Sequence, residues 1–231
     1  MKRFVFSFLF LATAFIAKAQ TADEIIAKHI EAIGGADAWK KINSVKMEGT
    51  LIVQGTTVIM KQTILHGKGN RQDISVMGMN GFMIIAPTSG WNFMPFNGQA
   101  APEPMTAEAV AEAQSELDAQ GNLIDNATKG HTVEYLGKDD VEGTDCYKLK
   151  INLKSGTSQT YYFDAKSYLL IRSLSKQKAN GQEVEITTNF SNYEKLPEGI
   201  VVPKSITLPF GEMNITKITI NSTVDESIFK N

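Results

Sequence analysis

Apolar and polar residues alternate along most of the chain after residue 45. Val45, Met47 and Leu51 fall on one side of a predicted strand, whereas Lys46 and Glu48 fall on the other. Comparable runs continue to residue 221, and turn sequences such as Asn180-Gly181, the strongest short hairpin signal in the chain, separate them. The pattern predicts about ten or eleven antiparallel strands.

The segment before the strands has a helical period. Thr21 and Glu24 form a capping-box sequence, and the isoleucines that follow recur at helical spacing until Gly34-Gly35 ends the run. These residues predict an amphipathic N-terminal helix.

A second helix is predicted in mid-chain, at 106–120, with Thr106 as its N-cap. Val110, Ala113 and Leu117 form a narrow apolar stripe, and the remaining faces carry an acidic row. Because such a helix has little to bury, we expect it to lie over another element as a lid.

These elements predict a mainly β fold with few helices. A sheet of this width must curl, because strongly twisted open sheets close or split as strands are added. We therefore expect an incomplete antiparallel β-barrel, closed by the N-terminal helix and the mid-chain helix, in a single domain over residues 20–231.

The first nineteen residues have the pattern of a signal peptide. Lys2 and Arg3 precede an apolar run that ends in small residues, and we expect cleavage after Ala19. The run is shorter than the roughly 20 residues that span a bilayer. No cysteine stands near the expected cleavage point, so we expect a periplasmic protein that is not itself a lipoprotein.

Charge argues against nucleic acid as a partner. The whole chain has a net charge of −2, and residues 20–231 hold 20 basic and 25 acidic residues, a net charge of −5.

Candidate catalytic groups are few and scattered. His29, His66 and His131 show no metal-ligand spacing, and Cys146 is the lone cysteine. We predict no catalytic residue, no metal site and no cofactor, and therefore a protein that is not an enzyme. An exported hydrolase stays possible at this stage only if these histidines converge.

Seven of the nine methionines lie between residues 47 and 105, together with several aromatic residues. Methionine suits surfaces that accept apolar partners of variable shape, although it also fills ordinary cores. In Phe82-Met83-Ile84-Ile85, successive apolar residues face opposite sides, so both faces of that strand require cover.

The stretch from Gly67 to Gln99 carries a resemblance to a known family. A glycine-led turn, two strands and the strand end Trp91-Asn92-Phe93-Met94-Pro95-Phe96 follow each other as in the LolA/LolB-like periplasmic carriers and acceptors of lipoproteins. The resemblance implies a half-barrel whose apolar cavity takes acyl chains.

The resemblance also implies positions for a binding site. The cavity residues would be drawn from Leu51, Met60, Ile64, Met77, Phe82, Ile84, Trp91, Phe93 and Phe96. Lys68 matches the position of an arginine in the carrier members, and Arg71 close by completes a polar gate. The helix with Val110, Ala113 and Leu117 is the expected lid.

The resemblance thus implies a periplasmic carrier that holds acyl chains of lipoproteins or lipids for transfer toward the outer membrane. Its partners would be an inner-membrane release complex and an outer-membrane acceptor, and we expect a monomer. The alternatives are a sensor or regulatory module, or a structural β-domain of the same fold without transport activity.

Overall fold

All strands of the computed structural model, which describes residues 21–179 and 182–231, belong to one antiparallel sheet. The expected signal peptide and the Asn180-Gly181 turn lie outside the described residues. The strands are β1 Ser44–Val53, β2 Thr56–Leu65, β3 Gly69–Val76, β4 Met79–Ile85, β5 Gly90–Phe93, β6 Glu103–Pro104, β7 Thr132–Val141, β8 Thr144–Asn152, β9 Ser158–Asp164, β10 Leu170–Ala179, β11 Gln182–Lys195, β12 Val201–Leu208 and β13 Gly211–Ile220.

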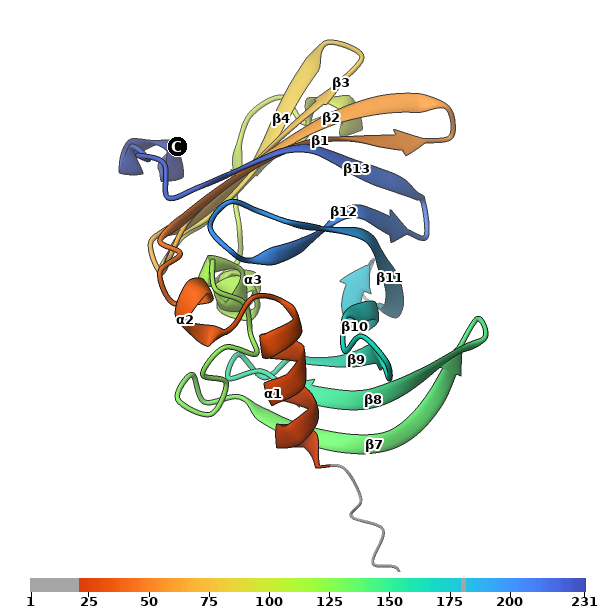
Figure 1. The fold of residues 1–231 in the computed structure, drawn as a ribbon. Helices are drawn as coiled ribbons and strands as arrows, with labels where there is room; N and C mark the ends of the chain where they lie inside the picture. Colours follow the sequence, from red (N-terminus) through yellow and green to blue (C-terminus); the bar gives the residue numbers. More distant parts are fainter. Residues whose placement is uncertain (1–20, 180–181) are drawn as a thin grey trace, which may run out of the picture.

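The sheet curves strongly but does not close. Its order is β6-β5-β4-β3-β2-β1-β13-β12-β11-β10-β9-β8-β7, so β6 and β7 are its free edges (Figure 1). This arrangement confirms the predicted incomplete barrel of a mainly β protein. The 13 strands exceed the expected number partly because β6 is only two residues long and carries no alternating pattern.

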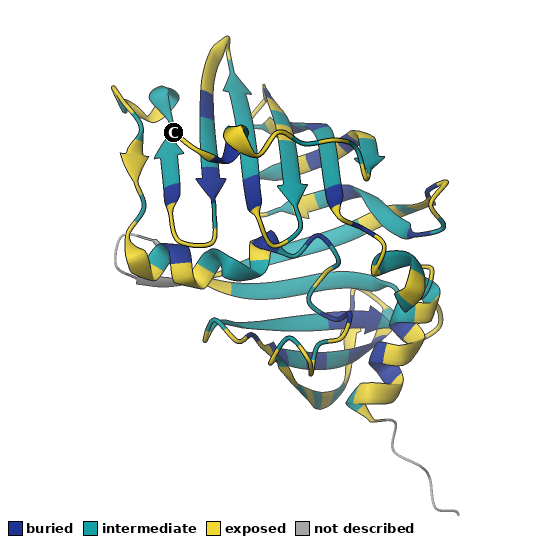
Figure 2. Ribbon diagram, turned by 90° about the vertical axis from the view of Figure 1, so that its left-hand side faces the viewer, coloured by how far each residue is buried: buried dark blue, intermediate teal, exposed yellow. Residues whose placement is uncertain are grey.

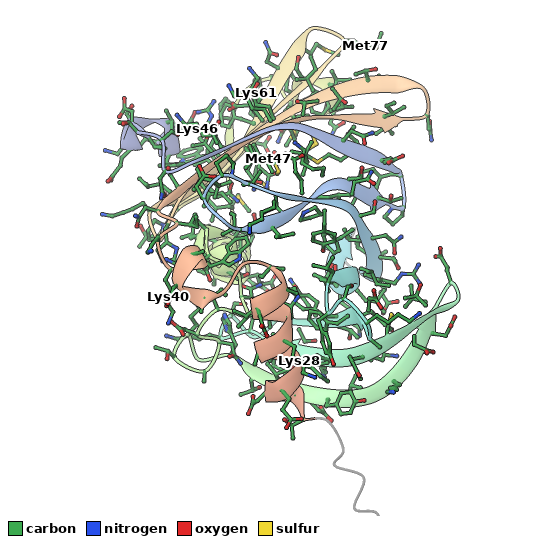
Figure 3. All side chains as sticks on the ribbon, viewed as in Figure 1. Lys28, Lys40, Lys46, Met47, Lys61 and Met77 are labelled. Atoms are coloured by element: carbon green, nitrogen blue, oxygen red, sulfur yellow. The ribbon has the colours of Figure 1, made fainter. Side chains whose placement is uncertain are left out.

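Strand register defines a concave and an outer face. Met47 is opposite Gln62 and Ile218, whereas its neighbour Lys46 is opposite Thr63 and Thr219. Because residues that pair across antiparallel strands point to the same face, odd positions of β1 and even positions of β2 face one way. Figure 3 shows Lys46 and Lys61 on the outer side of these strands and Met47 inside the curve.

Two helices lie inside the curve (Figure 1). They are α1 (Ala22–Ala32) and the short α2 (Ala36–Trp39). The predicted capping box is present, because Thr21 and Glu24 each accept a hydrogen bond from the other's backbone N–H. Within the part of the chain that the structure describes, no helix is long and apolar enough to cross a membrane.

The mid-chain helix is shorter than predicted. It consists of α3 (Ala107–Glu112), capped by Thr106, and the 3-10 helix η2 (Ala113–Leu117). The narrow apolar stripe explains the difference, because only Val110 and Leu117 of this segment are buried and little packing supports a regular helix.

The C-terminal segment crosses the outer face of β1–β4 in Figure 2 and ends in the 3-10 helix η3 (Glu226–Phe229). Phe229, which is 4% exposed, packs against Gly69 of β3. A Cβ at Gly69 would lie 2.3 Å from Phe229 Cγ, so glycine is required for this contact.

Candidate functional site

The concave face carries an apolar cluster built from strands alone, which we call the open cluster. Its buried members are Leu51, Val58, Met213 and Ile215, and its partly buried members are Met47, Val53, Met60, Ile74, Val76, Ile206, Leu208 and Ile218. Register places these side chains on the same face of β1, β2, β3, β12 and β13. Of the described residues in this cluster, none belongs to a helix.

Helices and loops cover the rest of the concave apolar surface. Ile25 and Ile26 of α1 pack with Leu149, Ile151 and the fully buried Phe163 of β8 and β9. A second cluster is completed by helical and loop residues around the strands, namely Ala38, Trp39, Ile42, Ala119, Leu196 and Ile200. The open cluster is therefore the part of the concave face that lacks helical cover.

The structure brings some predicted cavity residues to this face. Leu51 and Met60 belong to the open cluster, whereas Ile64 packs in the cluster beside α2. Phe96 lies in the 3-10 helix η1 (Pro95–Asn97), and its ring is close to Gly81, which is opposite Ile74 of the open cluster.

Four other predicted cavity residues face outward, which corrects their assignment to the interior. Phe82 is opposite Asp73 of β3 and Phe93 of β5, and the centroids of the Phe82 and Phe93 rings are 5.8 Å apart. Ile84 is opposite Arg71 of β3 and Trp91 of β5. Their neighbours on this face are the charged side chains of β3, so the row lies on the outer face of the sheet, where Ile84 is fully buried. The reason is that β4 is apolar on both faces, and its alternation alone does not indicate which face is inside.

Met77 is also displaced from the predicted position. It lies in the turn between β3 and β4 with φ 50° and is 83% exposed. The residue is visible at the tip of that hairpin in Figure 3.

The predicted polar gate does not face the interior. Lys68 is exposed in the turn between β2 and β3. Arg71 is on the outer face, where its guanidinium contacts Asp73 at 2.8 Å, donates to the Ile228 carbonyl at 3.1 Å and lies 4.9 Å from the Phe82 ring centroid. Arg71 therefore holds the C-terminal segment against the sheet.

The expected lid lies over one end of the sheet. Val110 and Leu117 are buried, Ala113 is half-buried, and the Leu117 carbonyl accepts a hydrogen bond from Gly67 N–H in the turn after β2. Val110 packs near Gly90, at the start of β5. The segment thus covers the strand ends near these turns, and none of its residues belongs to the open cluster, which includes Val58 near the start of β2.

A hydrogen-bonded chain joins η2 to the concave face. Glu116 accepts from Asn70 at 3.2 Å, and the Asn70 side-chain oxygen accepts from Gln62 at 3.2 Å. Loss of hydration raises the pKa of Glu116, while the hydrogen bond from Asn70 opposes that shift.

A polar cavity of about 580 Å³ lies beside this segment. Leu117 is the one predicted site residue among its lining, and His66 and His131 meet there with Asp118, Lys129 and Lys154. His29 is instead buried against Phe163, so the three histidines do not converge. Across residues 21–179 and 182–231, no three His, Cys, Asp or Glu side chains are grouped to hold a metal. Sequence reasoning missed Asp118, Lys129 and Lys154, because no local spacing connects residues from a long loop and a hairpin turn.

Comparisons with known proteins support a fold and not a closer relationship. No protein-family model matches the sequence, and no curated protein sequence matches it. Among solved structures, a LolA superfamily protein from Nitrosomonas europaea is similar with a TM-score of 0.58 and 12% identity over 92% of this chain and 99% of that one. A DUF1329 family protein from Desulfovibrio piger has a TM-score of 0.57 and 14% identity, covering 92% of this chain and 98% of that one.

A putative outer membrane lipoprotein-sorting protein domain from Vibrio parahaemolyticus is a third similar structure. Its TM-score is 0.52 and its identity 16%, over 89% of this chain and 94% of the other. These likenesses extend over nearly the whole of each chain and agree with the curved, unclosed sheet and its inner helices. The protein therefore has the LolA-like fold.

Proposed function

We propose that the protein is an exported carrier that holds acyl chains of lipoproteins or lipids against the concave face of its sheet. The observation that carries this proposal is the open cluster, which consists of strand residues without helical cover. Eight of its members are only partly buried, so an apolar ligand would gain contact there. The shared fold with a lipoprotein-sorting domain supports the same function.

Burial of hydrocarbon supplies enough free energy for such binding. Each buried CH₂ contributes about 0.8 kcal/mol, so six methylenes contribute roughly 5 kcal/mol without any polar contact. Met47, Met60 and Met213 belong to the cluster, and unbranched methionine side chains adjust easily to a guest of variable shape. Opening of the cluster by rotation of these side chains would admit the chain.

The proposed carrier acts in the periplasm. The pattern of residues 1–19 supports export to the periplasm with cleavage after Ala19. A carrier in that compartment would take its cargo from an inner-membrane complex, act as a monomer and deliver the cargo to an outer-membrane acceptor. Val110, Ala113 and Leu117 would close one end of the interior.

Adjacent residues of β2 offer a matched test. Met60 faces the open cluster, whereas Ile59 is on the outer face and 48% exposed. We expect Met60→Asp to weaken binding of a fluorescent fatty acid at least about tenfold, because a carboxylate next to the chain costs several kcal/mol. Ile59→Asp should bind like the wild type, and circular dichroism should show both variants folded.

Chain length provides a second measurement. If methylenes are buried, affinity for a series of saturated fatty acids should rise about fourfold per added CH₂ until the site is filled. Equal binding by all chain lengths, or equal loss in Met60→Asp and Ile59→Asp, would contradict the proposal.

A structural β-domain is the second candidate, and one observation favours it. The described cavity of about 580 Å³ is lined by residues of the mid-chain segment, the long loop and the neighbouring turns, and by no member of the open cluster. If the strand side chains alone fill the interior, no fatty acid of any length will bind, and a filled scaffold is then the better description.

A further inference from the structure

The polar cavity is formed where three turns and the mid-chain segment meet. It is lined by His66 and Gly67 after β2, by Pro87, by Ala111, Gln114, Ser115 and Leu117, by Asp118, Asn122, Lys129 and His131 of the long loop, and by Lys154 and Ser155 after β8. Its volume of about 580 Å³ is typical of small-molecule sites. His66 follows the end of β2, whereas Val58 and Met60 of the open cluster lie in its first half. No member of the open cluster lines the cavity, so this cavity is a different site from the proposed acyl site.

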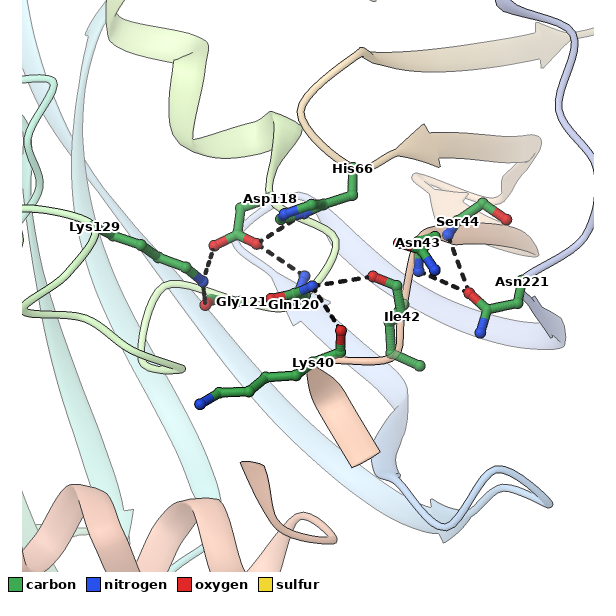
Figure 4. A network of polar contacts seen from close by, with 10 residues as sticks. All are labelled: Lys40, Ile42, Asn43, Ser44, His66, Asp118, Gln120, Gly121, Lys129 and Asn221. Carbon is green, nitrogen blue, oxygen red and sulfur yellow. Dashed lines mark hydrogen bonds and ion pairs between the residues drawn. The ribbon is translucent and has the colours of Figure 1, made fainter. Parts of the chain in front are cut away.

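Asp118 is the one carboxylate among the described lining residues, and both of its oxygens already have partners within the protein. Asp118, with a side chain 13% exposed, contacts Lys129 Nζ through Oδ2 at 2.5 Å and accepts from Gln120 N–H through Oδ1 at 2.9 Å (Figure 4). His66 Nδ1 lies 3.3 Å from Oδ1, close enough for an ion pair when protonated but without hydrogen-bond alignment. Asp118 therefore has little capacity left for a ligand, and it holds Lys129 in place.

The groups that remain available are mainly donors. Lys154 makes no ion pair with a described residue, and its stem lies against Gly130. The backbone N–H of Lys154 donates to His131 Nδ1 at 3.1 Å, which leaves the ring proton on Nε2. Apart from the two histidines, the charged side chains among the described lining residues are two lysines and Asp118, with a net charge of +1. Such a cavity suits an oxyanion.

One acceptor in the lining refines the ligand class. The Asn122 side chain hydrogen-bonds to Tyr161, but its buried Oδ1 accepts no hydrogen bond in the described part of the chain. A buried acceptor without a donor is costly, so a ligand that carries a hydroxyl would satisfy it. A hydrogen phosphate group has both acceptor oxygens for the lysines and a hydroxyl for Asn122, and phosphate groups near neutral pH are partly protonated.

We propose that this cavity binds a phosphate group, either free or as the headgroup of a phospholipid, between Lys154, Lys129 and His131. The proposal does not depend on acyl-chain binding. Lys154 supplies the uncompensated positive charge, and Lys129 is positioned by Asp118 and by a 2.9 Å hydrogen bond to the Gly121 carbonyl. Burial and the neighbouring Lys129 ammonium lower the pKa of His131, and a bound anion would raise it again.

The test compares two lysine variants of the full mature chain. Inorganic phosphate is titrated at constant ionic strength, and the His131 ring resonances are followed by NMR. Lys154→Gln should weaken phosphate binding about tenfold or more, as expected for loss of a charge-assisted hydrogen bond. Lys61→Gln, on the outer face, should leave it unchanged, and so should Met60→Asp, which separates this test from that of the acyl site.

A parallel titration with a short-chain phosphatidylglycerol, kept below its micelle concentration, distinguishes the two phosphate sources. Binding of inorganic phosphate that Lys154→Gln weakens supports a site for free phosphate. Binding of the lipid alone, again weakened by Lys154→Gln, supports a headgroup site. The proposal is overturned if neither probe shifts the His131 resonances, or if Lys154→Gln and Lys61→Gln behave alike.

Discussion

His29 makes the stability of the fold dependent on pH. The side chain lies on α1, is 6% exposed and packs against Phe163 with ring centroids 4.7 Å apart. Its Nδ1 lies 2.8 Å from the Tyr168 carbonyl and donates to it. Burial lowers the pKa of His29 to about 4, and the Tyr168 hydrogen bond opposes that shift only in part.

The protonation of His29 in the folded and unfolded chains determines whether stability rises or falls with pH. Between pH 6.5 and about 4 the unfolded chain binds a proton at His29 and the folded chain does not, so stability is lost as the pH falls through this window. A shift from 6.5 to about 4 corresponds to a loss of about 2.5 kcal/mol between pH 7.5 and pH 4.5.

The variant His29→Gln isolates this contribution. Other titrating groups, including Glu116 with its raised pKa, are common to both proteins and cancel in the difference. Urea unfolding, followed by circular dichroism at both pH values, gives the two free energies of unfolding. We expect the wild type to be the more stable protein at pH 7.5 and the difference to shrink or reverse at pH 4.5 by about 2.5 kcal/mol.

A difference between wild type and His29→Gln that stays constant from pH 7.5 to pH 4.5 would refute this reasoning. It would mean that the imidazole titrates alike in the folded and unfolded chains. Equal m-values for the two proteins are the control, because a changed slope would indicate altered exposure in one of the states.

Three further perturbations follow from the packing. Gly69→Ala should displace Phe229, because the new Cβ would overlap its ring, and limited proteolysis should then remove the C-terminal segment faster than in the wild type; unchanged cleavage would contradict the contact. Leu149→Ala, at a fully buried position below α1, should lower the free energy of unfolding by about 2–5 kcal/mol, whereas Ile59→Ala should change it by less than about 0.5 kcal/mol. Burial raises the pKa of the Cys146 thiol to about 11, so thiol reagents should label the protein only in denaturant, as counted by mass spectrometry.

The strand pattern and the N-terminal helix could be predicted because their signals are local. The capping box and the alternation in β1 and β8 depend on a few neighbouring residues, and one face of each strand is clearly polar. The orientation of β4 could not be predicted in this way. Phe82 and Ile85 point to opposite faces of an apolar strand, and only pairing of Phe82 with Asp73 shows that it faces outward.

The polar cavity lies beyond sequence reasoning for another reason. Asp118 and Lys129 are eleven residues apart in an irregular loop, and His66 joins them from a distant turn. No period or motif relates these positions, since their proximity results from the way the curved sheet brings the turns after β2 and β8 together. The expected lid illustrates the same limit, because its stripe predicts a buried face without indicating which part of the sheet it covers.

The unclosed sheet creates a need for cover that the helices meet only in part. A closed barrel would bury its inner side chains against each other, whereas a half-barrel exposes its concave face unless other elements lie on it. Ile25 and Ile26 of α1 cover β8 and β9, and the segment around Trp39 and Ile42 covers the middle of the sheet. Among the described residues, no helical residue belongs to the open cluster, and only Phe96 of η1 reaches its edge, beside Gly81. The open cluster is therefore an apolar region of the concave face without helical residues packed into it. An acyl chain lying along it would supply the apolar contacts that the helices make elsewhere on this face.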